Sequence, residues 1–239
     1  MKLFQTLGLA LLTVIWGASC AAPQPKSTSS YVSPSVVRVA NSALVESNFE
    51  DTWDRLVGEL ASRYYVINNI DKDSRLINLS FTTNEPSKYV SGGRSTRYFK
   101  AGGTVEDVSY DVAEAARYTI GQNAGDFGEY LILTSVVRKP TLEGRANVYI
   151  APEGEGTKVS VNCRYSLAVE ISGVAETKNA QGGVLRRDRI PTSNVTAAFS
   201  TNEPCTVDWG TPQDPTLVTF TSLGVFENDI LDIVRRKQE

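Results

Sequence analysis

KVSVNCRYSLAVEI, residues 158–171, is the stretch of this sequence that decides the fold. Apolar side chains occupy every second position from Val159 to Ile171, and they alternate with mostly polar ones that begin at Lys158. A period of two is typical of a β-strand with one buried face, because successive side chains point to opposite faces of a sheet. The pattern predicts a long strand whose buried face includes Cys163.

A partner strand is expected immediately before this one. Ala146, Val148 and Ile150 occupy alternate positions, and Pro152–Gly156 supplies a tight turn between the two segments, which predicts an antiparallel hairpin. Further strands are expected at Val36–Val45, Tyr64–Asn68, Leu76–Thr82, Tyr130–Val137, Val195–Phe199 and Val218–Phe220.

Two helices are predicted, one early and one at the C-terminal end. Ser47, followed three residues later by Glu50, has the pattern of a capping box that begins a helix. Apolar residues then recur at helical spacing and share one helix face: Phe49, Trp53, Leu56, Val57, Leu60 and Tyr64. The same spacing predicts the last helix from Leu223, Phe226, Ile230, Ile233 and Val234.

The fold class follows from the order of these elements. Residues 105–120 suit a helix or a strand, and residues 173–193 are expected to form a long polar excursion. Two amphipathic helices on one face of a curved antiparallel sheet would bury both apolar stripes. We therefore expect an α+β, helix-grip-like fold. The alternative is a β-sandwich to which the helices are additions.

The N-terminus has the proportions of a secretory signal. Lys2 precedes an apolar run, Leu3–Trp16, that is too short for a permanent membrane span. The small residues Gly17–Ser19 and then Cys20 follow. This pattern resembles the lipobox of bacterial lipoproteins, in which the cysteine carries fatty chains such as palmitate. The resemblance implies a signal peptide at residues 1–19 and lipidation of Cys20. The alternative is a plain secretory signal that is cleaved nearby.

The segment behind this cysteine is rich in Pro, Ser, Thr and Gln. Residues 20–35 have too few large apolar side chains to form a core, so they predict a lipidated, flexible tether ahead of one domain at residues 36–239. Ala21 stands where lipoproteins retained in the inner membrane of enterobacteria usually carry aspartate. The resemblance therefore implies an anchor in the outer membrane, with the domain facing the periplasm.

Charge and histidine content argue against several classes of function. The formal net charge is −3, and it becomes more negative when Lys2 leaves with the signal, so no nucleic-acid partner is expected. The chain has no histidine, which is the commonest general base and transition-metal ligand. We expect no enzyme activity, no cofactor and no metal site. The densest acidic cluster is expected to be a solvated face: Glu106, Asp107, Asp111 and Glu114.

Two cysteines remain behind Cys20. Disulfides persist in the compartments that exported proteins reach, so Cys163 and Cys205 are expected to form one. The alternative is two separately buried thiols, because the sequence does not place these two residues side by side.

One segment resembles a known family. Phe49–Leu56 (FEDTWDRL) and Ile70–Ile77 (IDKDSRLI) have the order of a capped helix with a tryptophan, a strand, an acidic turn and another strand. This order resembles the repeating domain of BamC (NlpB) type lipoproteins, which are accessory parts of the outer-membrane β-barrel assembly machinery. The resemblance covers Phe49–Phe81, and that family carries two such domains where one is expected here. It implies a location at the outer membrane and an accessory role there.

Together these observations predict an envelope lipoprotein with a non-catalytic accessory or structural role, exerted through contact with an envelope protein. Outer-membrane assembly is one such role. Candidate residues for a ligand or partner face are Trp53, Arg186, Arg187 and Arg189. The alternative function is a binding module for a lipid or small amphiphile, held in a cavity between helix and sheet.

Overall fold

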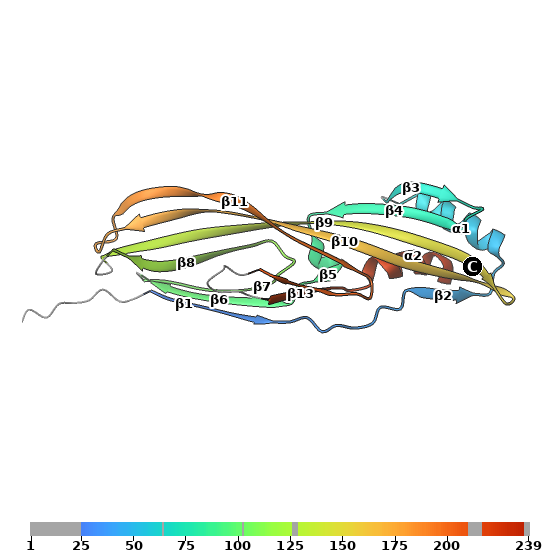
Figure 1. Cartoon of the computed structure of the whole chain (residues 1–239), viewed down its shortest axis with the longest axis horizontal. Helices are drawn as coiled ribbons and strands as arrows, with labels where there is room; N and C mark the ends of the chain where they lie inside the picture. The colour runs from blue at the N-terminus through green and yellow to red at the C-terminus, as the bar shows by residue number, and fades with distance from the viewer. Residues whose placement is uncertain (1–24, 64, 102, 126–128, 210–216, 237–239) are drawn as a thin grey trace, which may run out of the picture.

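The protein is an elongated, mostly β-stranded molecule in its computed structural model (Figure 1). The structure describes residues 25–63, 65–101, 103–125, 129–209 and 217–236. In chain order its elements are β1 (Lys26–Val32), β2 (Ser42–Val45), α1 (Phe49–Ala61), β3 (Val66–Asp71), β4 (Leu76–Thr83), the 3-10 helix η1 (Pro86–Lys88), β5 (Val90–Ser91), β6 (Arg94–Ala101), β7 (Thr104–Asp111), β8 (Ala116–Ala124), β9 (Tyr130–Glu153), β10 (Gly156–Lys178), β11 (Val184–Ser200), β12 (Cys205–Asp208), β13 (Leu217–Ser222) and α2 (Val225–Arg235).

The expected α+β, helix-grip-like class is wrong. Strands hold 64% of the described residues and helices only 14%. Most of residues 105–120 lie in β7 and β8, and residues 173–193, expected as a polar excursion, continue β10 through a turn into β11. Polar side chains allow this outcome because backbone pairing with neighbouring strands can hold a strand that buries no apolar face. The two helices therefore cover only part of a much longer sheet.

The hairpin β9–β10 organises this sheet and extends over most of the molecule's length (Figure 1). Its strands pair continuously from Glu153 and Gly156 beside the turn to Leu131 and Lys178 at the other end, so the predicted hairpin is confirmed. The strand order is β11-β10-β9-β4-β3, with β2 also paired to β10 and β8 also paired to β9. Gly154 adopts a φ of 63° in the turn, which glycine does without a steric penalty.

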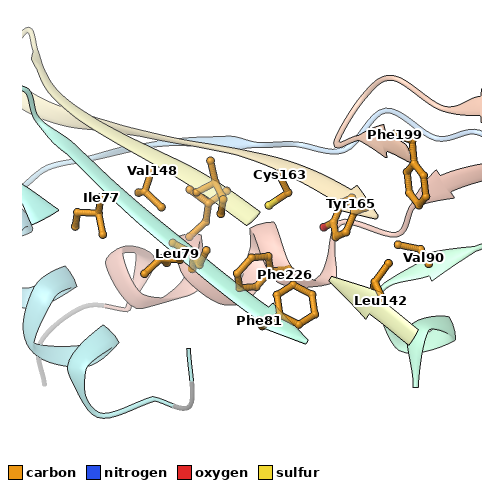
Figure 2. Packing of buried hydrophobic residues seen from close by; sticks show 14 of the residues in the cluster. Ile77, Leu79, Phe81, Val90, Leu142, Val148, Cys163, Tyr165, Phe199 and Phe226 are labelled. Atoms are coloured by element: carbon orange, nitrogen blue, oxygen red, sulfur yellow. The ribbon is translucent and has the colours of Figure 1, made fainter. Parts of the chain in front are cut away.

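A large apolar core lies on one face of the hairpin. In β10 every second residue from Val159 to Val169 is buried, which confirms the alternation. They belong to one core cluster with Leu79 of β4, and Figure 2 shows Cys163 and Tyr165 of this strand on the same side as the rings of Phe81 and Phe226. The ring centroids of Phe81 and Phe226 lie 4.4 Å apart. Full burial of one large apolar side chain contributes about 1.5–3 kcal/mol, so this core dominates the stability of the molecule.

Both helices pack on this core. α1 begins behind Asn48, whose side chain accepts a hydrogen bond from the backbone N–H of Asp51 at 2.9 Å. The predicted cap at Ser47 is therefore wrong by one residue, and the Ser47 hydroxyl instead bonds the Thr52 hydroxyl at 2.6 Å. Most of the predicted apolar faces are buried, namely Trp53, Leu56 and Leu60 in α1 and Phe226, Ile230, Ile233 and Val234 in α2. The prediction is wrong for Leu223, which precedes α2 and is 48% exposed. Tyr64, predicted for the face of α1, lies outside the described residues.

Part of the expected flexible tether is a strand. β1 pairs with β6 along its whole length, from Lys26 opposite Lys100 to Val32 opposite Arg94. Tyr31 holds this strand in place, since its hydroxyl donates to the carbonyl of Gly92 at 3.0 Å and accepts from the N–H of Thr219 at 2.9 Å. Composition predicts disorder here because the side chains are polar, yet backbone pairing supplies the order. The signal peptide and Cys20 lie outside the described residues.

The two ends of the molecule differ in what they carry (Figure 1). We call the end with the start of β1 and the turns β6–β7, β8–β9 and β10–β11 the β1 end. The opposite end, with the β9–β10 turn, α1 and α2, is the helix end. Near the β1 end the sheet β1-β6-β7 lies against β8. A third sheet, β12-β13-β5, lies near the middle of the molecule and contacts β11.

Candidate binding face

The central sheet has one face that the helices do not cover. Side chains between the buried positions of β4, β9 and β10 point to this face, because side chains alternate along a strand. The register places Arg145 of β9 between Arg164 of β10 and Ser80 of β4. This row and its two neighbours form what we call the binding face: Asn78, Ser80, Thr82, Glu143, Arg145, Asn147, Asn162, Arg164 and Ser166.

Asparagines form one row of the binding face. Asn78 Nδ2 donates to Asn147 Oδ1 at 2.6 Å, and Asn41 Nδ2 donates to Asn162 Oδ1 at 2.8 Å. A side-chain amide has two donor hydrogens and an oxygen with two lone pairs, so one bond leaves most of this capacity unused. The row can therefore donate to and accept from the backbone of a bound chain.

Two arginines lie directly opposite each other on this face. Arg145 and Arg164 are register partners in β9 and β10, and both are exposed. Glu143 neutralises Arg145 through an ion pair at 2.7 Å. Within the described part of the chain, the Arg164 guanidinium has neither a hydrogen-bond partner nor an ion-pair partner. Like charges directly opposite in a sheet are destabilising. Because Glu143 already offsets the charge of Arg145, a bound anion would act on the charge of Arg164.

A groove of about 700 Å³ lies beside the arginines. Strands β9, β10 and β11 form its floor, and the turn with Glu203, Pro204 and Cys205 forms one wall. Several hydrogen bonds hold this turn. Among them, Ser200 Oγ donates to the Glu203 carboxylate at 2.8 Å, and the N–H of Thr201 donates to the Cys163 carbonyl at 3.0 Å. The groove can hold an extended segment with an acidic side chain against Arg164.

The predicted disulfide is wrong, because Cys163 and Cys205 are both free thiols. Cys163 is 2% exposed and faces the core of β10, where burial first and then the charge of Glu227 raise the pKa of its thiol. Cys205 lies on β12 in the wall of the groove and is only half-buried, and burial raises its pKa as well. Alternation correctly predicts the buried side of Cys163, but the position of Cys205 depends on a turn that has no such pattern.

The other predicted face residues do not come together. Trp53 is 4% exposed and belongs to the apolar core, so it cannot present a ligand face. Strand β11 carries Arg186, Arg187 and Arg189 near the β1 end, and all three side chains are exposed. Arg186 pairs with Asp188 at 2.7 Å, and Arg187 pairs with Glu176 at 2.9 Å.

The acidic cluster of β7 and the turn after it is largely structural. Glu106 accepts hydrogen bonds from the N–H and the hydroxyl of Thr119, at 2.9 and 2.8 Å, and so holds the edge of β8. Asp111 accepts from the backbone N–H of Gly92 at 2.9 Å and of Ala113 at 2.8 Å. Among the described residues no group of acids and cysteines is arranged to hold a metal ion.

A buried polar cluster joins α2 to β10, and no sequence pattern signals it. Glu227 is fully buried in the first turn of α2 and accepts from the hydroxyls of Tyr165 at 2.8 Å and Ser222 at 3.2 Å. The helix dipole favours a carboxylate at this position. Burial raises the pKa of the Tyr165 hydroxyl, and the neighbouring Cys163 thiol and Glu227 carboxylate add to the rise. The cluster therefore positions α2 against β10.

Comparisons with known proteins identify no relative. The chain matches no protein-family model, and it matches neither a curated protein nor a solved structure. Membership of the lipoproteins, and of the family with the BamC type domain, therefore stays a prediction that rests on the resemblance alone. In the part of the chain that the structure describes, neither helix has the length and apolar character to cross a bilayer.

Proposed function

We propose that this chain is a lipid-anchored protein of the bacterial envelope that acts through contact rather than catalysis. In this proposal fatty chains on Cys20 hold the molecule on the outer membrane, where it faces the periplasm. The binding face then receives an extended, acidic segment of a protein partner. An accessory role in outer-membrane assembly is compatible with such a partner.

The observation that carries this proposal is the unpaired guanidinium of Arg164. It lies exposed in a groove, next to a second arginine, and no acid of the described chain neutralises it. A partner carboxylate could form two parallel N–H···O bonds with it, which are among the stronger hydrogen bonds in proteins. The asparagine row could bond the partner backbone next to this carboxylate.

Two further features support the proposal. The chain contains no histidine, and the acids of its densest cluster are largely engaged in structural hydrogen bonds. Cys20 follows small residues behind an apolar run, which is the arrangement that lipidation needs. The alternative of a lipid carrier depended on a cavity beside Trp53, and the burial of this residue in the core leaves it without an observation in its favour.

Metabolic labelling with palmitate tests the anchor. We expect the wild-type chain to incorporate label and to fractionate with membranes. Cys20→Ala should abolish labelling and release the protein, because one residue carries all the fatty chains in this proposal. An unlabelled wild type, or a Cys20→Ala variant that stays on the membrane, would contradict it.

Crosslinking through the native Cys205 thiol tests the binding face. A thiol-reactive photocrosslinker should label Cys205 in folded protein, since Cys163 is buried. After irradiation of isolated envelopes we expect a discrete protein adduct that Arg164→Glu largely abolishes. Lys158→Glu, the same charge change at the β9–β10 turn, should leave the adduct intact. Equal adduct yields in both variants would rule out this face as the contact.

A further inference from the structure

The start of β1 lies close to the anchor proposed above. Only residues 21–25 separate Cys20 from Lys26, the first residue of β1. A chain extends at most about 3.6 Å per residue, so these residues span no more than about 22 Å. A fully flexible tether of residues 20–35, as expected from composition, could span more than twice this distance. A lipid on Cys20 therefore keeps the β1 end near the bilayer surface.

Basic side chains gather at this end. Lys26 and Lys100 are register partners in β1 and β6, both are exposed, and neither has an acidic partner within the described residues. Arg189 on β11 is exposed and likewise unpaired in the described structure. As with the arginines of the binding face, two lysines opposite each other in a sheet repel unless anions approach them.

The acids at this end do not cancel these cations. Glu176 already contacts Arg187 at 2.9 Å and Lys178 at 3.7 Å, and Asp188 contacts Arg186. Glu129 is the remaining described acid near the β8–β9 turn, and it has an interaction of its own. Two further acids of this end follow Val105 on β7: Glu106, which accepts from Thr119, and Asp107, which is exposed. With these acids included, basic side chains outnumber acidic ones by six to five among the described residues of the β1 end, although the whole chain has a net charge of −3.

Exposed apolar side chains accompany the cations. Leu185, beside the β10–β11 turn, is 57% exposed, and Val105, beside the β6–β7 turn, is equally exposed. Tyr130 begins β9 at the same end and is 38% exposed. Aliphatic and aromatic side chains next to basic ones are the combination that favours the interface of an anionic bilayer.

We propose that the β1 end docks directly on the anionic surface of the membrane that carries the anchor, so that the molecule stands end-on. This inference rests on the lipid anchor of the proposed function and adds an orientation to it. Arg145 lies 15 residues along β9 from Tyr130, which corresponds to about 50 Å at about 3.3 Å per residue. Docking would hold the binding face at roughly that distance from the bilayer.

Depth-dependent quenching tests this orientation. The lipidated full chain, purified from membranes, is reconstituted on vesicles of phosphatidylethanolamine and phosphatidylglycerol that contain a headgroup-linked quencher. In a Cys205→Ser background, one fluorophore is placed at Leu185→Cys and another at Glu155→Cys in the β9–β10 turn. We expect strong quenching at Leu185→Cys and little at Glu155→Cys. Quenching at Leu185→Cys should weaken in high salt, because salt screens exposed charges.

Charge reversal separates docking from anchoring. Lys26→Glu with Lys100→Glu should reduce quenching at Leu185→Cys to the level of the distal label, while Lys72→Glu with Lys158→Glu at the helix end should not. The unreversed protein on vesicles of phosphatidylcholine alone should show the same loss of quenching at Leu185→Cys. If the protein floats with the vesicles but both labels are quenched equally, docking is overturned and the anchor stands. If the protein does not float at all, the anchor fails and this inference fails with it.

Discussion

The two halves of the β9–β10 hairpin share one register but differ in what covers them. Toward the helix end, alternate residues of β9 from Pro140 to Ile150 are buried, and those from Leu142 onward adjoin the apolar core on which α1 and α2 pack. Toward the β1 end, only Val136 and Arg138 of β9 are buried, and the facing part of β10 is only half-buried. Alternation thus accounts for the strand, whereas the covering layer decides how deeply it is buried.

The cores of these halves also differ in chemistry. The helix half has an apolar core with closely packed phenyl rings. In the other half Tyr110 and Tyr118 stack with centroids 5.8 Å apart, Arg97 lies 4.4 Å from the Tyr118 ring, and Arg138 lies 5.4 Å from the Tyr110 ring. Cation–π contacts contribute about 0.5–2 kcal/mol each, less than a buried phenylalanine. We therefore expect equivalent changes to be more costly in the helix half.

Phe226→Ala should have the largest effect. The ring is fully buried, and its centroid lies 4.4 Å from that of Phe81 and 4.9 Å from that of Tyr65. Its removal leaves a cavity and should lower the free energy of unfolding by about 3–5 kcal/mol, measured by urea denaturation. Val136→Ala in the other half should cost only about 1–2 kcal/mol, since it removes two methyl groups. Equal losses would contradict the difference between the halves.

Two strand glycines offer a matched comparison of overpacking. Gly144 of β9 lies against the ring of Phe81, and Gly121 of β8 lies against the ring of Phe99, so an added Cβ would collide with each ring. Gly144→Ala should destabilise by about 1–3 kcal/mol, because Phe81 is held between Tyr89 and Phe226. Gly121→Ala should cost less, because the core at the β1 end is smaller. Thermal melting of the two variants checks the order, and the reverse order would refute it.

Arg97→Ala probes the cation–aromatic core. The substitution should lower the free energy of unfolding by about 1 kcal/mol, because it removes the contact with the Tyr118 ring. Burial alone would raise the pKa of Tyr110. That pKa is nevertheless lowered, because the charge of Arg138, the hydrogen bond that Arg97 Nε donates to the Tyr110 hydroxyl and the charge of Arg97 together outweigh burial. The variant should therefore raise the pKa of Tyr110. Absorbance titration of tyrosinate, with Arg97→Ala/Tyr110→Phe as the reference, measures this shift. An unchanged titration would exclude Arg97 as a cause.

The start of α1 should show the smallest effect. Asn48→Ala removes the cap to Asp51 and should cost about 1 kcal/mol. Ser47→Ala removes only a hydroxyl contact with Thr52 and should cost less. Chemical denaturation of both variants distinguishes the cap seen in the structure from the one that the Ser47–Glu50 spacing predicts. A larger loss for Ser47→Ala would favour the latter.

Local patterns predict the strongly periodic elements well. The hairpin, both helices and the burial of Cys163 follow from spacing, because a half-buried strand or helix must repeat its apolar residues at a period of two or about 3.6. β1 and the β10–β11 hairpin are missed, since their polar strands are held by backbone pairing and bury little. The binding face is missed for a related reason. Arg145 and Arg164 are visible as polar positions of the alternation, but only the register makes them neighbours.

The amino-acid pattern alone determines where this chain forms its long central strands and which side of each is apolar. It also places Cys20 behind an apolar run, from which the proposed anchor derives. Tertiary structure decides how far the strands continue past the helices, that Cys163 and Cys205 are free thiols, and that two arginines lie side by side. The physical reason is the separation along the sequence of the residues that interact. Periodicity reflects interactions between residues a few positions apart, whereas register and covering layers join segments that are far apart in the sequence.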